Sequence, residues 1–187
     1  LACPGVPDFY QGNELWDFSL VDPDNRRAVD EGAREKLLTE VCSLGDQPGE
    51  ALDAIFAAPE DGRAKLYVMW RLLRLRAARE TLFREGGYTA VRVAGARARH
   101  ALAFARRHAG ELCVTVVPRL MVGLGVATGK LPCGAIWEDT RIELPFAAEG
   151  SGLVDAITGR EHRVEAGGLA LAALLGRASV AVLTSGG

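Results

Sequence analysis

The residues with the clearest capacity for chemistry lie together near the start of the chain, between Pro4 and Asp30. This stretch carries four aromatic rings, Asp-Pro and Pro-Asp turns, and an adjacent pair of arginines. Aromatic faces stack on the apolar face of a sugar ring, while Asp, Asn and Arg side chains bind neighbouring hydroxyls in pairs. The composition is that of a loop, and it predicts the rim of a carbohydrate-binding site.

The same residues also fit a structural role. Phe9, Trp16 and Phe18 would then be buried packing residues, while Asp22 and Asp24 would fix a turn through hydrogen bonds to the backbone. The sequence leaves both interpretations open for each of these residues.

Two stretches resemble ligand-binding loops but fail in detail. Residues 123–130, GLGVATGK, lack the GxGxxG spacing, and no Ser or Thr follows Lys130, so a flexible connection between strands is the better interpretation. Residues 22–27, DPDNRR, begin like a calcium loop, but arginines stand where a ligand and the turn glycine are needed. We therefore predict no cofactor and no metal ion.

The other residues with chemical potential are scattered. The chain has no GxSxG elbow, no CxxC pair and no histidine at the spacing of a triad or metal site. The residues concerned are His100, His108, His162, Cys3, Cys42, Cys113 and Cys133. The cysteines fit free thiols in a reducing compartment, so we expect a cytoplasmic protein without disulfides.

Composition excludes several classes of protein. With 187 residues, 49% of them hydrophobic, the chain is long enough to bury a core. A net charge of −2 provides no overall electrostatic attraction for nucleic acid, and no apolar run is long enough to span a membrane. These properties predict a globular chain with no nucleic-acid or membrane partner.

Helical periodicity dominates up to Gly86. Asp30 is placed to cap a helix that ends at Gly45, with its apolar face formed by Ala33, Leu37, Val41 and Leu44. A short second helix is expected between Asp46 and Pro59, opened by Asp46 and Pro48 and with its buried edge formed by Leu52, Ile55 and Phe56.

The strongest helical signal runs without interruption from about Asp61 to Arg84. Its apolar stripe consists of Leu66, Met69, Trp70, Leu73 and Ala77. The arginines of this segment are interpreted as a solvated face, because acidic residues flank both of its ends.

Beyond Gly86 the chain reads as short strands separated by turn residues, without an intervening helix. Eight strands are expected at residues 88–93, 100–107, 111–117, 140–144, 153–157, 161–165, 169–174 and 179–184. Ala109-Gly110 and Thr158-Gly159 should close hairpins. The pattern predicts an antiparallel β-sandwich over residues 87–187 that follows a helical part over residues 1–86.

Several short motifs of this sequence are similar to motifs of a known enzyme family. Residues 4–14, PGVPDFYQGNE, resemble the segment that leaves the eighth barrel strand in the α-amylase family of glycoside hydrolases, with its G-x-P-x-x-Y-x-G-x-E pattern. Similar stretches continue through DPDNRR, WRLLRLR and FREGGY to the β-rich part, so the resemblance covers essentially the whole chain. Two departures are Ala28 and Asn13, which stand where the most similar sequences carry other residues.

The resemblance implies an α+β fold in which residues 1–86 are the remnant of the last βα unit of a (β/α)8 barrel with helices, and residues 87–187 are the C-terminal β-sandwich domain. It also implies that the parent enzyme is an intramolecular transglycosylase, converting the reducing-end α-1,4 linkage of maltooligosaccharides to an α,α-1,1 linkage. The family's catalytic acids come from barrel strands four, five and seven, which would precede Leu1. The chain is therefore expected to be an inactive fragment with no catalytic residue of its own.

Within this resemblance, six polar and aromatic residues of the opening loop are the candidates for contacting sugar in the intact enzyme. They are Tyr10, Glu14, Asp22, Asn25, Arg26 and Arg27. Arg26 is favoured, because a planar guanidinium suits paired hydroxyl contacts.

Two other functions remain open: a noncatalytic carbohydrate-binding or scaffold module, and a hydrolytic or branching relative. Saturable binding of maltooligosaccharide by the isolated chain would favour the module. We also expect self-association through an apolar stripe around Leu66, Trp70 and Leu73, which the absence of the barrel would leave exposed.

Overall fold

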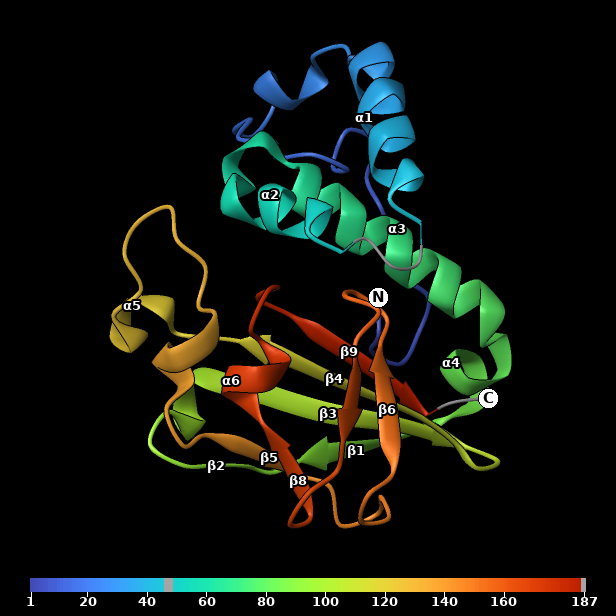
Figure 1. Cartoon of the computed structure of the whole chain (residues 1–187). Helices are drawn as coiled ribbons and strands as arrows, with labels where there is room; N and C mark the ends of the chain where they lie inside the picture. Colours follow the sequence, from blue (N-terminus) through green and yellow to red (C-terminus); the bar gives the residue numbers. More distant parts are fainter. Residues whose placement is uncertain (46–48, 186–187) are drawn as a thin grey trace.

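The structure, a computed structural model, describes residues 1–45 and 49–185, and it divides into a helical layer and two sheets (Figure 1). The helical layer holds α1 (Glu31–Ser43), α2 (Ala51–Ala57), α3 (Arg63–Ala78) and α4 (Glu80–Glu85), with 3-10 turns η1 (Asp24–Arg26) and η2 (Pro59–Asp61). In Figure 1 these helices lie on one side of the molecule and the strands on the other.

The first two helices follow the sequence pattern. The Asp30 side chain accepts a hydrogen bond from the Ala33 amide at 2.9 Å, which confirms Asp30 as the N-cap of α1. α2 buries Leu52, Ile55 and Phe56, also as predicted. The predicted opening of α2 at Asp46 and Pro48 lies outside the described residues.

The prediction of one continuous helix from Asp61 to Arg84 is wrong. The helix breaks at Arg79, whose backbone leaves the helical region with φ −125° and ψ 44°, and α4 continues from Glu80 in a new direction. The Arg79 side chain pairs with Glu111 on the neighbouring sheet. The break turns Leu82 and Phe83 into the core, where both are buried, so a long-range contact and apolar burial override local periodicity.

The strands form two antiparallel sheets. The larger has the order β1-β3-β4-β9-β6-β7 and the smaller β2-β5-β8. Their bounds are β1 Gly87–Val91, β2 Val93–Ala94, β3 Ala101–His108, β4 Glu111–Pro118, β5 Arg141–Glu143, β6 Gly152–Asp155, β7 Glu161–Arg163, β8 Gly168–Ala170 and β9 Ala181–Ser185. Both predicted hairpins are confirmed, since β3 pairs with β4 and β6 with β7 across the two expected turns.

The expectation of no helix among the strands is wrong. Short helical turns occur at η3 (Ala98–His100), α5 (Met121–Leu124), η4 (Gly134–Trp137) and α6 (Leu171–Leu174). The predicted strand at residues 169–174 is correct only at its start, because α6 follows β8 directly. A helical turn there buries Leu171, Leu174 and Leu175 together, and an extended chain would alternate their side chains between two faces.

The larger sheet is the middle layer of the molecule. On one face, Ala103, Val114 and Leu183 share a core with Ile142 and Leu169 of the small sheet region, which makes the β part a two-layer sandwich. On the other face, a second core joins the sheet to the helical layer through residues that include Tyr67, Phe104, Cys113, Ile157 and Val182. Alternation along β3, β4 and β9 therefore supplies apolar side chains to both cores. The domain boundary at Gly86 and the barrel origin of residues 1–86 stay predictions.

The four cysteines are free thiols. Burial raises the pKa of the Cys113 thiol to about 12, so this side chain stays protonated as a core residue. Among residues 1–45 and 49–185, no three His, Cys, Asp or Glu side chains are grouped to hold a metal ion. No helix in this part of the chain is long and apolar enough to cross a membrane.

Candidate functional site

The opening loop, residues 4–30, contains no regular element except η1, and contacts from the helices hold it in place. Arg76 of α3 donates from Nη1 to the Leu1 carbonyl at 2.5 Å and from Nη2 to the Gly5 carbonyl at 3.0 Å. Ala2, between these two contacts, is buried in the core that joins helices to sheet. The start of the loop is therefore fixed to α3.

A second contact fixes the middle of the loop. Arg34, in the first turn of α1, donates from Nε to Oε2 of Glu14 at 3.0 Å and from Nη2 to the Gly12 carbonyl at 2.8 Å. Gly12 has φ +92°, and a Cβ there would lie 3.1 Å from Val29, so a side chain at this bend would be strained. Sequence reasoning missed Arg34, because nothing in its local pattern points to a partner twenty residues earlier.

Trp16 is anchored but not buried. Its indole Nε1 donates to the Pro59 carbonyl at 2.6 Å, and the Lys65 ammonium lies 5.1 Å from the centre of its ring. Lys65 also donates to the Leu15 carbonyl at 2.8 Å. With 46% of its surface exposed, Trp16 ties the loop to α3 and still presents part of its ring to solvent.

The end of the loop is organised by its own charges. Arg26 donates to Asp22 at 2.9 Å and Arg27 pairs with Asp24, whose other carboxylate oxygen accepts from the Leu20 amide at 2.9 Å. These bonds support the interpretation that the two aspartates shape a turn. Asn25 lies in η1 between these pairs, and its side chain is outside the described part of the structure.

The loop also contains Asp17, a carboxylate whose pKa is lowered by its neighbours. The hydroxyl and amide of Ser19 hold the pKa of Asp17 below its usual value, so this exposed side chain is a stable carboxylate rather than a proton donor at neutral pH.

The predicted residues whose side chains the structure describes do not share one cavity. Tyr10 lines a wide, shallow depression of about 520 Å³ together with Asn13, Asp17 and Leu20, whereas Glu14 lines a separate hollow of about 240 Å³ beside Arg34. Asp22, Arg26 and Arg27 line neither of these hollows. Their role in substrate binding stays a prediction.

The loop also exposes an unusual amount of apolar surface. The large apolar side chains concerned are Val6, Phe9, Tyr10, Trp16, Phe18, Leu20 and Val21, with exposed fractions from 40% for Phe9 to 94% for Val6. Of the two interpretations left open for Phe9, Trp16 and Phe18, the structure therefore excludes the one in which they are buried packing residues. A loop that exposes this many large apolar side chains is typical of a surface that another part of a protein covers.

No protein-family model matches the chain. Comparisons with curated sequences and with solved structures both find matches, and these agree with each other. Proteins from two strains of Mycobacterium tuberculosis, which carry the provisional name maltooligosyl trehalose synthase, are 40% identical over 159 residues, covering 85% of this chain and 16% of theirs.

Solved structures show the same similarity over a larger part of the chain. The maltooligosyltrehalose synthase of Arthrobacter ramosus superposes with a TM-score of 0.73 at 36% identity, over 99% of this chain and 21% of that one. A further maltooligosyl trehalose synthase crystal structure has a TM-score of 0.62 at 23% identity, which shows the fold alone. The chain thus spans only about a sixth to a fifth of the length of the proteins it matches.

Proposed function

This chain is homologous to a region of the maltooligosyltrehalose synthases, and we propose that it is the C-terminal part of such an enzyme. The parent protein would convert the reducing-end α-1,4 linkage of a maltooligosaccharide to an α,α-1,1 linkage by intramolecular transfer of glucose. The observation that carries this proposal is the match over 99% of the chain at 36% identity and a TM-score of 0.73.

Within that protein, the opening loop would position sugar and leave bond cleavage to other parts. Retaining glycosidases require a nucleophilic carboxylate and a proton-donating carboxyl about 5–5.5 Å apart. In this loop the Glu14, Asp22 and Asp24 carboxylates are already engaged by arginines, and Asp17 is held as an anion. These contacts favour a role for Glu14, Asp22, Arg26 and Arg27 in binding rather than proton transfer. Tyr10 and Asn25 are proposed as sugar contacts on the resemblance alone.

The 187-residue chain is expected to form no trehalose-terminated product from maltopentaose. The physical reason is that an active site at the end of a barrel is assembled from loops that follow several strands, and one such loop cannot supply the acid pair. The measurement is chromatography of the reaction mixture after prolonged incubation, with a full-length synthase of the Arthrobacter ramosus type as positive control. Any trehalose-terminated product formed by the chain alone would overturn the proposal that the acids lie elsewhere.

We further propose that the exposed apolar loop packs against the rest of the parent protein, and that the isolated chain self-associates because this surface is open. We assign this contact to the loop rather than to the predicted stripe, since Leu66 is buried and Trp70 is mostly buried, although Leu73 is exposed at 42%. Sedimentation velocity should show the average mass rising with concentration, and Phe18→Ser should reduce this rise. Leu73→Ser is the matched control and should leave the rise in mass unchanged. A larger effect of Leu73→Ser than of Phe18→Ser would show that the contact is made through α3.

A further inference from the structure

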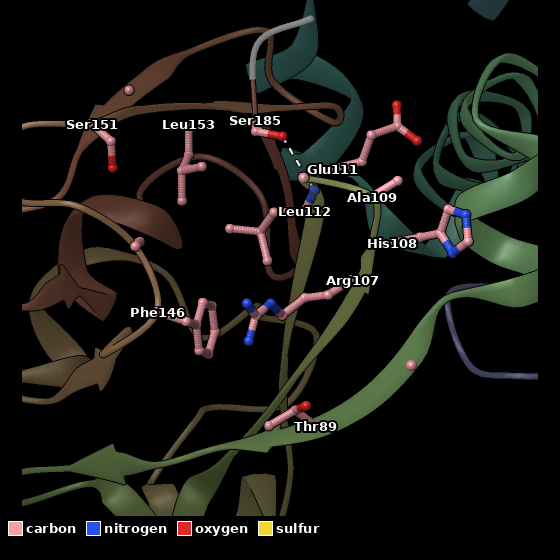
Figure 2. A pocket seen from close by; sticks show the side chains of 14 residues that line it. Thr89, Arg107, His108, Ala109, Glu111, Leu112, Phe146, Ser151, Leu153 and Ser185 are labelled. Atoms are coloured by element: carbon pink, nitrogen blue, oxygen red, sulfur yellow. Dashed lines mark hydrogen bonds between the residues drawn. The ribbon is translucent and has the colours of Figure 1, made fainter.

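A cavity of about 510 Å³ lies at one end of the β-sandwich, far along the chain from the opening loop. Its walls come from β1, the β3–β4 hairpin, β6, the end of β9 and the segment after β5 (Figure 2). Leu112, Leu153 and Phe146 form its apolar lining, and Thr89, Ser151 and Ser185 add hydroxyl groups. Its volume falls within the range of about 300–1,000 Å³ that is typical of small-molecule sites.

Strand alternation decides which charges enter this cavity. Arg107 is opposite Leu112 in the β3–β4 ladder, and His108 is opposite Glu111, so the two pairs point to opposite faces of the sheet. Figure 2 shows the Arg107 guanidinium directed toward Phe146, with the Glu111 carboxylate and the His108 ring turned away. Glu111 is also engaged by Arg79 on the helix side. Of the three charged or titratable side chains that line the cavity, Arg107 is therefore the one directed into it.

Phe146 holds the Arg107 guanidinium from one side. The guanidinium carbon lies 5.0 Å from the centre of the Phe146 ring, a cation–π arrangement that orients the planar fork. Among residues 1–45 and 49–185, the structure gives the Arg107 side chain no hydrogen bond and no ion pair beyond this contact. Its N–H groups remain available to a ligand that enters the cavity.

Hydroxyl groups add to this supply of donors. The Ser185 Oγ accepts a hydrogen bond from the Leu112 amide at 3.2 Å, so its own proton is left to donate. Thr89 contributes a second hydroxyl from β1. Ser151 donates to the Ala148 carbonyl at 2.6 Å, which leaves its oxygen to accept from a ligand hydroxyl. An oriented guanidinium with neighbouring hydroxyls favours an anion that also carries hydroxyl groups.

We propose that this cavity binds the phosphate or carboxylate group of a small hydroxylated organic anion through Arg107. The anionic group meets the guanidinium, and the hydroxyl-bearing body lies between Thr89, Ser151 and Ser185 against the apolar lining. Binding here is independent of the activity proposed for the parent enzyme, because the cavity shares no residue with the opening loop.

The test is a titration of the ¹⁵N-labelled 187-residue chain with glucose 6-phosphate, gluconate, inorganic phosphate and glucose, followed by amide chemical shifts. Glucose 6-phosphate or gluconate should shift the amides of Thr89, Leu112 and Ser185 saturably, with an affinity that falls as salt is added. Arg107→Gln should weaken this binding by about tenfold or more, because a charged hydrogen bond is lost. The dispersion of the spectrum reports in each titration that the variant is folded.

The matched control is Arg119→Gln, since Arg119 is an exposed arginine just beyond the opposite end of β4. This variant should bind the anions as tightly as the unmodified 187-residue chain does. Glucose binding as tightly as glucose 6-phosphate, or anion binding that survives Arg107→Gln in a folded variant, would overturn the proposal. The absence of saturable binding by every probe would overturn it as well.

Discussion

Replacing Tyr67 with alanine is expected to lower the free energy of unfolding by about 3–5 kcal/mol, the usual cost of deleting a large buried aromatic ring. Tyr67 lies on α3 with no exposed surface, in the core between the helical layer and the larger sheet. Its hydroxyl donates to the Ile157 carbonyl, in the turn between β6 and β7, at 2.8 Å. The substitution therefore opens a cavity at the contact that joins the two layers and leaves a buried carbonyl without this donor.

Chemical denaturation followed by tryptophan fluorescence and circular dichroism measures this loss. Tyr67→Phe is the matched control, because it keeps the ring and removes only the hydrogen bond, for a cost of about 1 kcal/mol. If the helical layer and the sandwich unfold as one unit, both signals move to lower denaturant together. A loss below about 1 kcal/mol for the alanine variant would show that this contact does not join the layers.

Replacing Asp155 with alanine is expected to destabilise the chain by about 2–6 kcal/mol, because two buried amides would lose their acceptor at about 1–3 kcal/mol each. The Asp155 side chain is fully buried at the end of β6. Its Oδ1 accepts from the Ile157 amide at 3.1 Å and the Val182 amide at 3.0 Å, while Oδ2 accepts from the Thr158 hydroxyl at 2.7 Å. These bonds hold the turn that receives Tyr67.

Asp155→Asn is the matched control and should retain most of the stability. An amide oxygen in the Oδ1 position still accepts from both backbone amides, and the new NH₂ group can donate to the Thr158 hydroxyl oxygen. Denaturation of both variants measures the difference. An asparagine variant as unstable as the alanine variant would show that the carboxylate acts through its charge rather than as an acceptor.

The stability of the unmodified chain and that of Asp155→Asn are expected to depend differently on pH. Desolvation raises the pKa of Asp155 above its ordinary 3.8, although the three hydrogen bonds oppose this effect. The folded chain therefore binds this proton more tightly than the unfolded chain, so the associated stability is complete below about pH 3.8 and is lost as the pH rises. Burial lowers the pKa of His162, which gives a slope of the opposite sign below pH 6.5. Because the charges of Asp155 and His162 interact, the difference between the unmodified chain and Asp155→Asn reports the two side chains as a coupled pair.

These two residues also connect the sandwich to the candidate sugar rim. The turn after β6 receives Tyr67 and also accepts a hydrogen bond from Arg71 of α3 at the Ala156 carbonyl, at 2.7 Å. α3 in turn holds the opening loop through Lys65 and Arg76. The β-sandwich and the opening loop are therefore connected through α3.

Local patterns along the chain were sufficient for much of the fold. The Asp30 cap, the buried edge of α2 and both hairpin turns needed only the residues within a few positions of each feature, and the structure has all of them. The resemblance of the opening motif to carbohydrate-active enzymes also came from a short run of residues, and homology to the maltooligosyltrehalose synthases agrees with it. Short-range hydrogen bonds and backbone preferences act in the same way whatever the rest of the chain does.

Contacts between distant residues decided the remainder. The helix breaks at Arg79, where the side chain pairs with Glu111 on the larger sheet and the chain then buries Phe83. No local pattern contains the information about these contacts. The same holds for the bond from Arg34 to Glu14, which shapes the rim, and for Arg107, whose chemistry depends on a phenylalanine 39 positions later. A side chain's type limits what it can bind, but only packing determines which partner it meets and whether its donors remain free.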